Sequence, residues 1–275
     1  MKAYALSLAA LLLAACQADT KNLNDKIDKL DKKLDAILAQ RGGGGGAAGA
    51  QAPRPSRPEP DRSKTYAVSI DGDPFDGPAD AKVTVVKAYD YACPYCERVR
   101  GTMEELHKKY GENLRVVYKQ LVVHPQTAMS GALAFCAAAK QGKGPQMDAL
   151  IWDKSFKARQ FAPDQCWNSD AGCELLNGFA QELQLDVNKF KADMKSCQTV
   201  VNNDMSELRK FGVGATPSFF INGRFMSGAM PIDNFVAIID EEMKKADERI
   251  QQGTPKAQYY QQWVIDKGLK SLDAK

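Results

Sequence analysis

The sequence is poor in the residues that most often bind metal ions. Only two of its 275 residues are histidine, and these two, His107 and His124, are isolated from one another. A structural zinc site needs about four nitrogen or sulfur ligands at short spacings, but Cys93 and Cys96 form the single Cys-x-x-Cys pair of the sequence. We therefore expect no metal and no other cofactor, and we interpret this pair as a redox dithiol.

Long apolar runs and strongly basic stretches are also missing. A helix that spans a bilayer needs about 20 consecutive apolar residues, and no run reaches that length. The net charge is only +3 and no basic segment is interleaved with aromatic residues, so we expect no nucleic-acid partner. A hydrophobic content of 44% is nevertheless ordinary for a chain with a real core.

The N-terminus has the pattern of a targeting signal. Lys2 precedes an apolar stretch, and residues 1–15 end just before Cys16 in Leu-Ala-Ala-Cys. This ending resembles a bacterial lipobox, which implies cleavage before Cys16 and a lipid anchor on that cysteine. Because Gln17 follows, the resemblance favours an outer-membrane protein of the cell envelope that faces the periplasm. The alternative is an ordinary signal peptide with Cys16 incidental.

Residues 16–41 and 42–63 differ sharply in composition. In the first segment apolar residues recur at spacings of four and three, which predicts a short coiled-coil helix and a homo-oligomer. The alternatives are a solvated spacer helix and a helix that lies along the envelope surface. The second segment has a five-glycine run followed by four prolines, so we expect a disordered tether. The coiled-coil positions are Leu23, Ile27, Leu30, Leu34 and Ile37.

The Cys-x-x-Cys pair lies between a predicted strand and a predicted helix. The apolar run over residues 83–89 predicts the strand, and apolar residues at helical spacing continue to Tyr110. The free N–H groups of a helix N-terminus favour a thiolate, so we expect a lowered pKa at Cys93. Cys96 is three residues away, within bridging distance, and Pro94 suits the first helical position.

The remaining globular sequence alternates strands with a long helical block. We predict a strand over 66–70, a loop over 71–80, and a strand over 114–118 that runs parallel to the strand before Cys93. Asn222-Gly223 predicts a hairpin turn between strands 218–221 and 224–227. The block over 126–211 is predicted to contain helices at 128–141, 147–156 and 175–183, a helix opened by Asp186, and another over 198–211; a helix over 232–243 closes the domain.

This order of elements resembles the DsbA-like thiol–disulfide oxidoreductases of the thioredoxin superfamily. The resemblance covers residues 64–249 and implies an α/β thioredoxin fold with an inserted all-helical domain. It implies that Cys93 attacks and forms the mixed disulfide and that Cys96 resolves it. It also implies a cis peptide between Thr216 and Pro217, whose backbone would pair with a bound substrate strand. The resemblance rests on Tyr91-Ala92-Cys93-Pro94-Tyr95-Cys96 and on Gly212-Val213-Gly214-Ala215-Thr216-Pro217-Ser218-Phe219-Phe220-Ile221-Asn222-Gly223.

Two positions depart from the family's pattern. Strongly oxidising members often have histidine at the position of Tyr95, and members tend to have an acidic residue at the position of Lys87. Lys119 on the next strand is a second cation. If both lysines point towards Cys96, they stabilise thiolates and make the disulfide more oxidising. If Lys87 points outward, it has no role.

Four cysteines remain once Cys16 and the dithiol are assigned, and four cysteines allow three pairings. We favour Cys166–Cys173, which closes a short turn-rich loop, together with Cys136–Cys197, which joins two distant helical segments. Buried free thiols are the alternative.

We therefore predict an enzyme that introduces disulfides into reduced or unfolded secreted proteins and is recycled by a membrane or soluble redox partner. One alternative is an oligomeric disulfide isomerase or reductase of the same fold. Another is a non-enzymatic envelope lipoprotein that binds a partner. Residues 250–275 are predicted to form a helical tail that docks on the domain through Tyr260, Trp263 and Val264.

Overall fold

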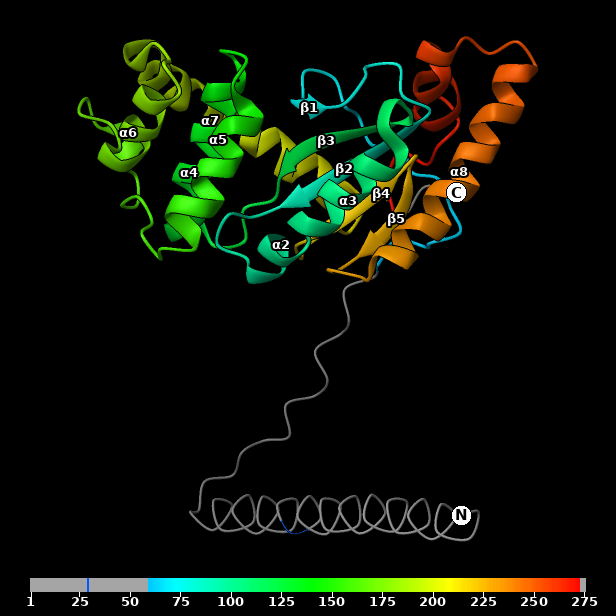
Figure 1. Ribbon diagram of the computed structural model, residues 1–275, viewed down its shortest axis with the longest axis horizontal. Coiled ribbons are helices and arrows are strands. Elements are labelled where there is room, and N and C mark those ends of the chain that lie inside the picture. The colour runs from blue at the N-terminus through cyan, green and yellow to red at the C-terminus, as the bar shows by residue number, and fades with distance from the viewer. Residues whose placement is uncertain (1–28, 30–58, 273–275) are drawn as a thin grey trace, which may run out of the picture. The chain divides into compact units, whose positions relative to one another are not determined.

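The computed structural model describes Lys29 and residues 59–272 (Figure 1). The chain divides into two units, Met1–Ser56 and Arg57–Lys275, and the architecture below is that of the second unit. The predicted signal peptide, the lipidated Cys16, the coiled-coil positions and most of the tether lie outside the described residues. Within the part of the chain that is described, no helix has both the length and the apolar character needed to cross a bilayer.

A five-stranded mixed sheet in the order β1-β3-β2-β4-β5 forms the centre of the domain. As predicted, β2 and β3 pair in parallel, with Val83 opposite Leu114 and Tyr89 opposite Gln120. The other neighbours pair antiparallel. The parallel pair brings the carboxyl end of β2, where the dithiol follows, beside the carboxyl end of β3. The strands are β1 (Phe75–Asp76), β2 (Val83–Tyr89), β3 (Leu114–Gln120), β4 (Ser218–Ile221) and β5 (Arg224–Ser227).

The two faces of the sheet are covered by different helices. Side chains alternate along a strand, so Val85 and Lys87 of β2 lie on one face and Val86 and Ala88 on the other. The first face packs against α3 and α8, and the second packs against the end of α7 and the segment around Tyr66. The elements on the first face are α2 (Pro94–Arg98), α3 (Arg100–Tyr110), the 3₁₀ turn η1 (Gly111–Asn113) and α8 (Ile232–Gln251).

The predicted all-helical insertion is present and lies to one side of the sheet in Figure 1. Two disulfides fasten it, and both have the predicted pairing. Cys136–Cys197 joins α4 to α7, and Cys166–Cys173 closes the short loop before α6. The insertion consists of α4 (Pro125–Ala139), α5 (Gly144–Leu150), the π-helical turn η2 (Ile151–Phe156), the 3₁₀ turn η3 (Cys166–Asn168), α6 (Glu174–Glu182) and α7 (Val187–Lys210).

Residues 187–210 form the single helix α7, so the prediction of two separate helices was wrong. The predicted break fell beside Cys197, which is fully buried and bonded to α4. A pattern search that looks for large apolar residues does not count Cys197 or the buried Asp204. The apolar face of the helix is then read as interrupted. The buried stripe is in fact continuous at spacings of three and four: Phe190, Met194, Cys197, Val201, Asp204 and Leu208.

Three smaller predictions also need correction. Residues 66–70 form no strand, because their backbone groups pair with separate segments: Tyr66 with Gly223, and Ala67 with Leu269. The predicted loop over 71–80 contains β1, which pairs with β3. The closing helix α8 runs on to Gln251, past its predicted end at residue 243.

The C-terminal segment docks on the domain, as predicted. Tyr260 and Val264 are buried, and the Tyr260 hydroxyl donates a hydrogen bond to the carbonyl oxygen of Val68 at 2.8 Å. Trp263 is half-buried, and the Arg249 guanidinium lies 3.9 Å from its ring centroid. The segment therefore links the residues around Val68 to α8. It contains the 3₁₀ turn η4 (Lys256–Gln258) and the π-helical turn η5 (Tyr260–Ile265).

Candidate active site

Cys93 is the N-cap of α2, immediately after β2 and its following turn. Pro94 occupies the first turn of the helix, as predicted, and the backbone N–H of Cys96 donates to the carbonyl oxygen of Cys93 at 3.1 Å. Cys93 and Cys96 are only 5% and 2% exposed, whereas Pro94 and Tyr95 between them are exposed. The dithiol is thus presented on a short helical turn whose intervening residues face solvent.

Cys93 has the features of a nucleophilic thiol. The hydrogen bond from Cys96 and the backbone N–H groups of Cys96 and Tyr95 outweigh burial and lower the pKa of Cys93 to about 5. Its Sγ atom lies 3.3 Å from the carbonyl oxygen of Thr216, to which the protonated thiol donates. At neutral pH Cys93 is therefore a thiolate, the form that attacks disulfides.

Cys96 has the opposite character. Burial, together with its hydrogen bond to the Cys93 sulfur, raises the pKa of Cys96 well above its ordinary value. Because one thiol is ionised and the other stays protonated, the two cysteines have different roles in thiol–disulfide exchange. Cys93 reacts first, and Cys96 becomes reactive only when it loses its proton.

Thr216 and Pro217 lie in the loop before β4, beside the dithiol. Their peptide bond is cis, as the resemblance implied. The backbone oxygen of Thr216 faces Cys93, and the Oγ1 atom of Thr216 is buried without a hydrogen-bond partner among the described residues. The structure thus brings Cys93, Cys96, Thr216 and Pro217 together from sequence positions more than a hundred residues apart.

Asp90 ties the dithiol turn to the start of the insertion, a role that the sequence analysis missed. Its buried carboxylate accepts backbone N–H groups from Ala92 at 2.6 Å, from Val123 at 2.6 Å and from His124 at 2.8 Å. His124 also places its Nδ1 atom 3.3 Å from the carboxylate. An acidic residue directly after a buried strand was the available signal, because such a residue is costly to bury unless it accepts several hydrogen bonds.

Lys87 is buried beneath the dithiol and does not point to solvent. Its Nζ atom lies 4.4 Å from the ring centroid of Tyr89 and 4.6 Å from that of Tyr118, a geometry in which aromatic faces stabilise a cation. Burial lowers its pKa, while the nearby Asp148 carboxylate and the Cys96 thiolate raise it. Among the described residues, no carboxylate lies within ion-pair distance of this ammonium.

Lys119 does not act on the dithiol, and its predicted supporting role there was wrong. It is paired with Ala88 of β2 and therefore lies on the opposite face of the sheet from Lys87. Its ammonium contacts three carboxylates, at 2.6 Å from Asp73, 3.1 Å from Asp204 and 3.0 Å from Glu207. These carboxylates neutralise its charge, so it is not available to the dithiol.

A buried chain of hydrogen bonds lies next to Lys87 and leads into the insertion. Gln120 donates to the Tyr89 hydroxyl at 2.6 Å, and the hydroxyls of Tyr89 and Tyr91 are 3.1 Å apart. The Tyr91 hydroxyl donates to Oδ1 of Asp148 at 2.7 Å, and the Trp152 indole donates to the same oxygen at 3.2 Å. The sequence analysis missed this chain because its members come from two strands and a distant helix.

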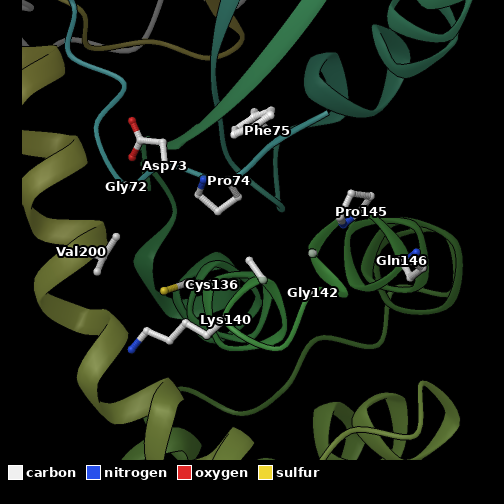
Figure 2. A pocket seen from close by; sticks show the side chains of 12 residues that line it. Gly72, Asp73, Pro74, Phe75, Cys136, Lys140, Gly142, Pro145, Gln146 and Val200 are labelled. Carbon is white, nitrogen blue, oxygen red and sulfur yellow. The ribbon is translucent and has the colours of Figure 1, made fainter. Parts of the chain in front are cut away.

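A pocket of about 430 Å³ lies away from the dithiol (Figure 2). It is bounded by residues 72–75 of the loop that leads into β1 and by the carboxyl end of α4, with Cys136 and Lys140 in its wall, whereas the dithiol adjoins the amino end of α4. None of the predicted catalytic residues lines it. Among the described residues, no cluster of three or more histidine, cysteine or acidic side chains is arranged to hold a metal ion.

Comparisons with known proteins agree with the fold. A family described as Thioredoxin (Thioredoxin_4) matches residues 69–241. Among solved structures, α-DsbA1 of Wolbachia pipientis is similar with a TM-score of 0.54 at 19% identity, over 66% of this chain and 96% of that chain. Oxidised BdbD of Bacillus subtilis is similar with a TM-score of 0.51 at 22% identity, over 68% of this chain and all of that chain. At these identities the likeness concerns the fold, and the predicted thioredoxin fold is confirmed.

Curated relatives include much longer proteins. The Na⁺/H⁺ antiporter NhaA of Herminiimonas arsenicoxydans is 34% identical over 167 residues, which are 60% of this chain and 24% of the antiporter. NhaA 1 of Salinispora arenicola is 31% identical over 177 residues, 62% of this chain and 25% of that protein. The chain thus matches about a quarter of the length of these relatives.

Proposed function

The chain belongs to the thioredoxin family, and from this premise we propose that it is a thiol–disulfide oxidoreductase that introduces disulfides into reduced secreted proteins. In the proposed reaction a substrate thiolate attacks Cys93 of the oxidised pair. The Cys93–Cys96 bond breaks, a mixed disulfide forms at Cys93, and Cys96 leaves as a thiolate. A second substrate thiolate then attacks the mixed disulfide, and Cys93 leaves with the electron pair.

The observation that carries this proposal is the environment of the Cys93 sulfur. A pKa of about 5 lies between the values of about 7 in a reductant such as thioredoxin and about 3.5 in a strong oxidant. A stabilised thiolate favours the reduced form, so the oxidised form gives its disulfide away more readily. Lys87 strengthens the effect, since an ammonium buried on the side of the dithiol favours thiolates.

Substrate recognition is proposed to use the loop before β4. The Thr216 backbone, whose carbonyl oxygen is already aimed at the Cys93 sulfur, would pair with an extended substrate segment, as in other cases of strand addition. Exposed Tyr95 beside the dithiol would contact the same segment. Both features suit unfolded chains rather than one folded partner.

The proposed setting is the bacterial cell envelope. Lipid on Cys16 would anchor the protein, with residues 42–63 as a tether, in the outer membrane and facing the periplasm. A membrane or soluble redox partner would reoxidise the dithiol. Leu23, Ile27, Leu30, Leu34 and Ile37 would associate as a homo-oligomer, the arrangement that the rival isomerase or reductase function would use.

The deciding experiment is acid-quenched thiol trapping of Cys93 and Cys96 in intact cells. A mainly oxidised pair is expected for a disulfide donor that a redox partner keeps oxidised. A mainly reduced pair would contradict the oxidase proposal and favour an isomerase or reductase. A C96S variant provides the matched control, because its Cys93 thiolate can attack a disulfide of a partner protein, expel the other sulfur as a thiolate and stay trapped in the mixed disulfide, whereas a C93S variant should accumulate none.

A further inference from the structure

The hydrogen-bonded chain beside Lys87 ends at Asp148, which belongs to the helical insertion and not to the thioredoxin sheet. Asp148 is a buried carboxylate on α5, held by the Tyr91 hydroxyl at 2.7 Å and the Trp152 indole at 3.2 Å. Both donors approach the same oxygen, so the side chain has a fixed position. A buried carboxylate is retained at a considerable energetic cost, and both hydrogen-bond donors to Asp148 are neutral groups.

Lys87 is a buried cation on the same face of the sheet, and the charge of Asp148 favours its ammonium. Tyr89, Tyr91 and Trp152 belong to the same buried cluster as Cys93 and Cys96, and the Lys87 ammonium lies over the Tyr89 ring at 4.4 Å. The Tyr89 hydroxyl is in turn 3.1 Å from that of Tyr91, which donates to Asp148. The acid and the lysine are therefore connected through two tyrosines.

We propose that Asp148 is a positioning residue that acts through Lys87: it keeps the lysine charged, and the charged lysine stabilises the Cys96 thiolate that leaves during exchange. The proposal rests on the thiol–disulfide chemistry proposed above. It gives the helical insertion a part in the reaction, since one of its own residues sets the electrostatics of the dithiol.

The charges around Lys87 support this direction. Burial disfavours its ammonium, Asp148 and the Cys96 thiolate favour it, and Arg100 of α3 opposes it. The titratable neighbours on the strands are Tyr89 of β2 and Tyr118 of β3, whose own pKa values are raised by burial, so both remain neutral near pH 7. Among the described residues, Asp148 is thus the carboxylate that favours the Lys87 ammonium, and its removal takes that stabilisation away.

Two possible mechanisms for Asp148 predict opposite changes in the rate of thiol–disulfide exchange. If Asp148 acted directly on the dithiol, its negative charge would repel the leaving Cys96 thiolate, and an Asp148→Asn variant would react faster. If it acts through Lys87, the variant loses the charge on the lysine and reacts more slowly. Asparagine keeps the Oδ1 acceptor for Tyr91 and Trp152, so the packing of the site is preserved.

The test is the rate at which glutathione reduces the oxidised full-length protein. Glutathione thiolate attacks the Cys93 sulfur, the Cys93–Cys96 bond breaks, and Cys96 leaves with the electron pair and then takes up a proton. A second glutathione thiolate releases Cys93 and forms glutathione disulfide. We expect D148N and K87M each to slow the first step about three- to tenfold, because a neighbouring charge shifts a pKa by about one unit.

The double variant D148N/K87M distinguishes an effect that passes through Lys87 from an independent one. D148N should add no further slowing in the K87M background, whereas independent effects would multiply. Asp204→Asn is the matched control, since Asp204 is also a buried aspartate but pairs with Lys119 on the other face of the sheet. Three carboxylates share that one lysine, so the loss of one should be tolerated, and the rate should not change.

A faster or unchanged D148N, or slowing that persists in the K87M background, would overturn the proposal. Circular dichroism of each variant separates a changed rate from a changed fold. The outcome is independent of the cellular role, because glutathione exchange needs only a working dithiol. A wild-type protein that exchanges normally but is found reduced in cells would contradict the oxidase function and leave the assignment of Asp148 intact.

Discussion

The Cys93 sulfur lies 3.3 Å from the carbonyl oxygen of Thr216, although 123 positions separate the two residues in the sequence. The contact fixes the nucleophile against the loop that precedes β4. In the thiol form the sulfur donates a hydrogen bond to this oxygen. In the thiolate form the neighbouring Cys96 thiol and backbone N–H groups supply the stabilisation. The pH behaviour of the dithiol follows from this arrangement.

Alkylation of the reduced protein should follow the titration of Cys93. Because its pKa is lowered to about 5, we expect the rate of reaction with iodoacetamide to be nearly constant from pH 7 upward. On acidification the rate should fall to half near pH 5. Stopped-flow alkylation of the reduced protein with both cysteines present checks this, because the Cys96 thiol stays protonated and its hydrogen bond is needed to lower the pKa of Cys93. A midpoint near the ordinary cysteine value would show that Cys93 is not activated.

The stability of the reduced protein should increase with pH between about 5 and 9. The pKa of Cys93 falls from its model-peptide value of 9.0 to about 5 on folding, so in this window the unfolded chain binds one more proton than the folded chain. Stabilisation from Cys93 is therefore complete above pH 9 and is lost as the pH falls through 5. Cys96, whose pKa is raised, stays protonated in the folded state across the window, and in the unfolded chain it begins to ionise only near pH 9.

The measurement for this prediction is the difference in Tm between the reduced protein and its C93S variant. Every other titrating group occurs in both proteins, so its contribution cancels. A difference that stays flat across the window would contradict the assigned pKa of Cys93.

Replacing Lys119 by methionine should reduce stability but leave the dithiol unchanged. Burial disfavours the Lys119 ammonium, but Asp204, Asp73 and Glu207 outweigh burial and raise its pKa. Without it, the buried carboxylates of Asp73 and Asp204 and the partly buried one of Glu207 lose their cation, at a cost of about 3–5 kcal/mol in the free energy of unfolding at neutral pH. The cost should shrink in acid, where the carboxylates take up protons.

K87M is the natural comparison for this variant, because both changes remove one buried lysine from the sheet. K87M should slow exchange with glutathione, whereas K119M should not. Denaturant titrations combined with that exchange rate check both statements, and an altered rate in folded K119M would restore a role for Lys119 at the dithiol.

The two disulfides of the insertion should differ in their contribution to stability. They close loops with sequence separations of 61 and 7 residues. On loop entropy alone, Cys136–Cys197 contributes about 4 kcal/mol and Cys166–Cys173 about 2 kcal/mol. Paired cysteine-to-alanine variants and denaturant unfolding test this order. Equal losses would mean that the longer link does not constrain the unfolded chain.

The hairpin turn should tolerate no side chain at Gly223. Its φ is +83°, and a Cβ atom there would lie 2.6 Å from the carbonyl oxygen of Tyr66. We expect Gly223→Ala to cost about 1–2 kcal/mol from the left-handed backbone and about 1–3 kcal/mol more from the clash. Gly228 is the matched control, since its φ is +86° but a Cβ atom would meet nothing within 4 Å. Equal losses in the two alanine variants would exclude the clash.

The sequence by itself determined the parts of the protein that depend on local chemistry. The cysteine spacing and the adjoining apolar run placed Cys93 at a helix N-terminus, and Asn222-Gly223 specified the hairpin, with φ values of +43° and +83°. Alternation and helical periodicity are properties of neighbouring residues, so strands β2 and β3 and most of the insertion could be predicted. The break that was wrongly placed in α7 arose where a buried cysteine and a buried acid stand in an apolar stripe.

Only the tertiary structure decided which charges meet. Lys87 and Lys119 both lie on central strands. The sequences of these strands do not indicate which helices cover each face of the sheet. The register of β2 and β3 places the two lysines on opposite faces. The end of α7 then brings Asp204 to Lys119, while α5 brings Asp148 towards Lys87. Burial makes such encounters energetically decisive, yet they join segments distant in sequence, and local patterns carry no information about them.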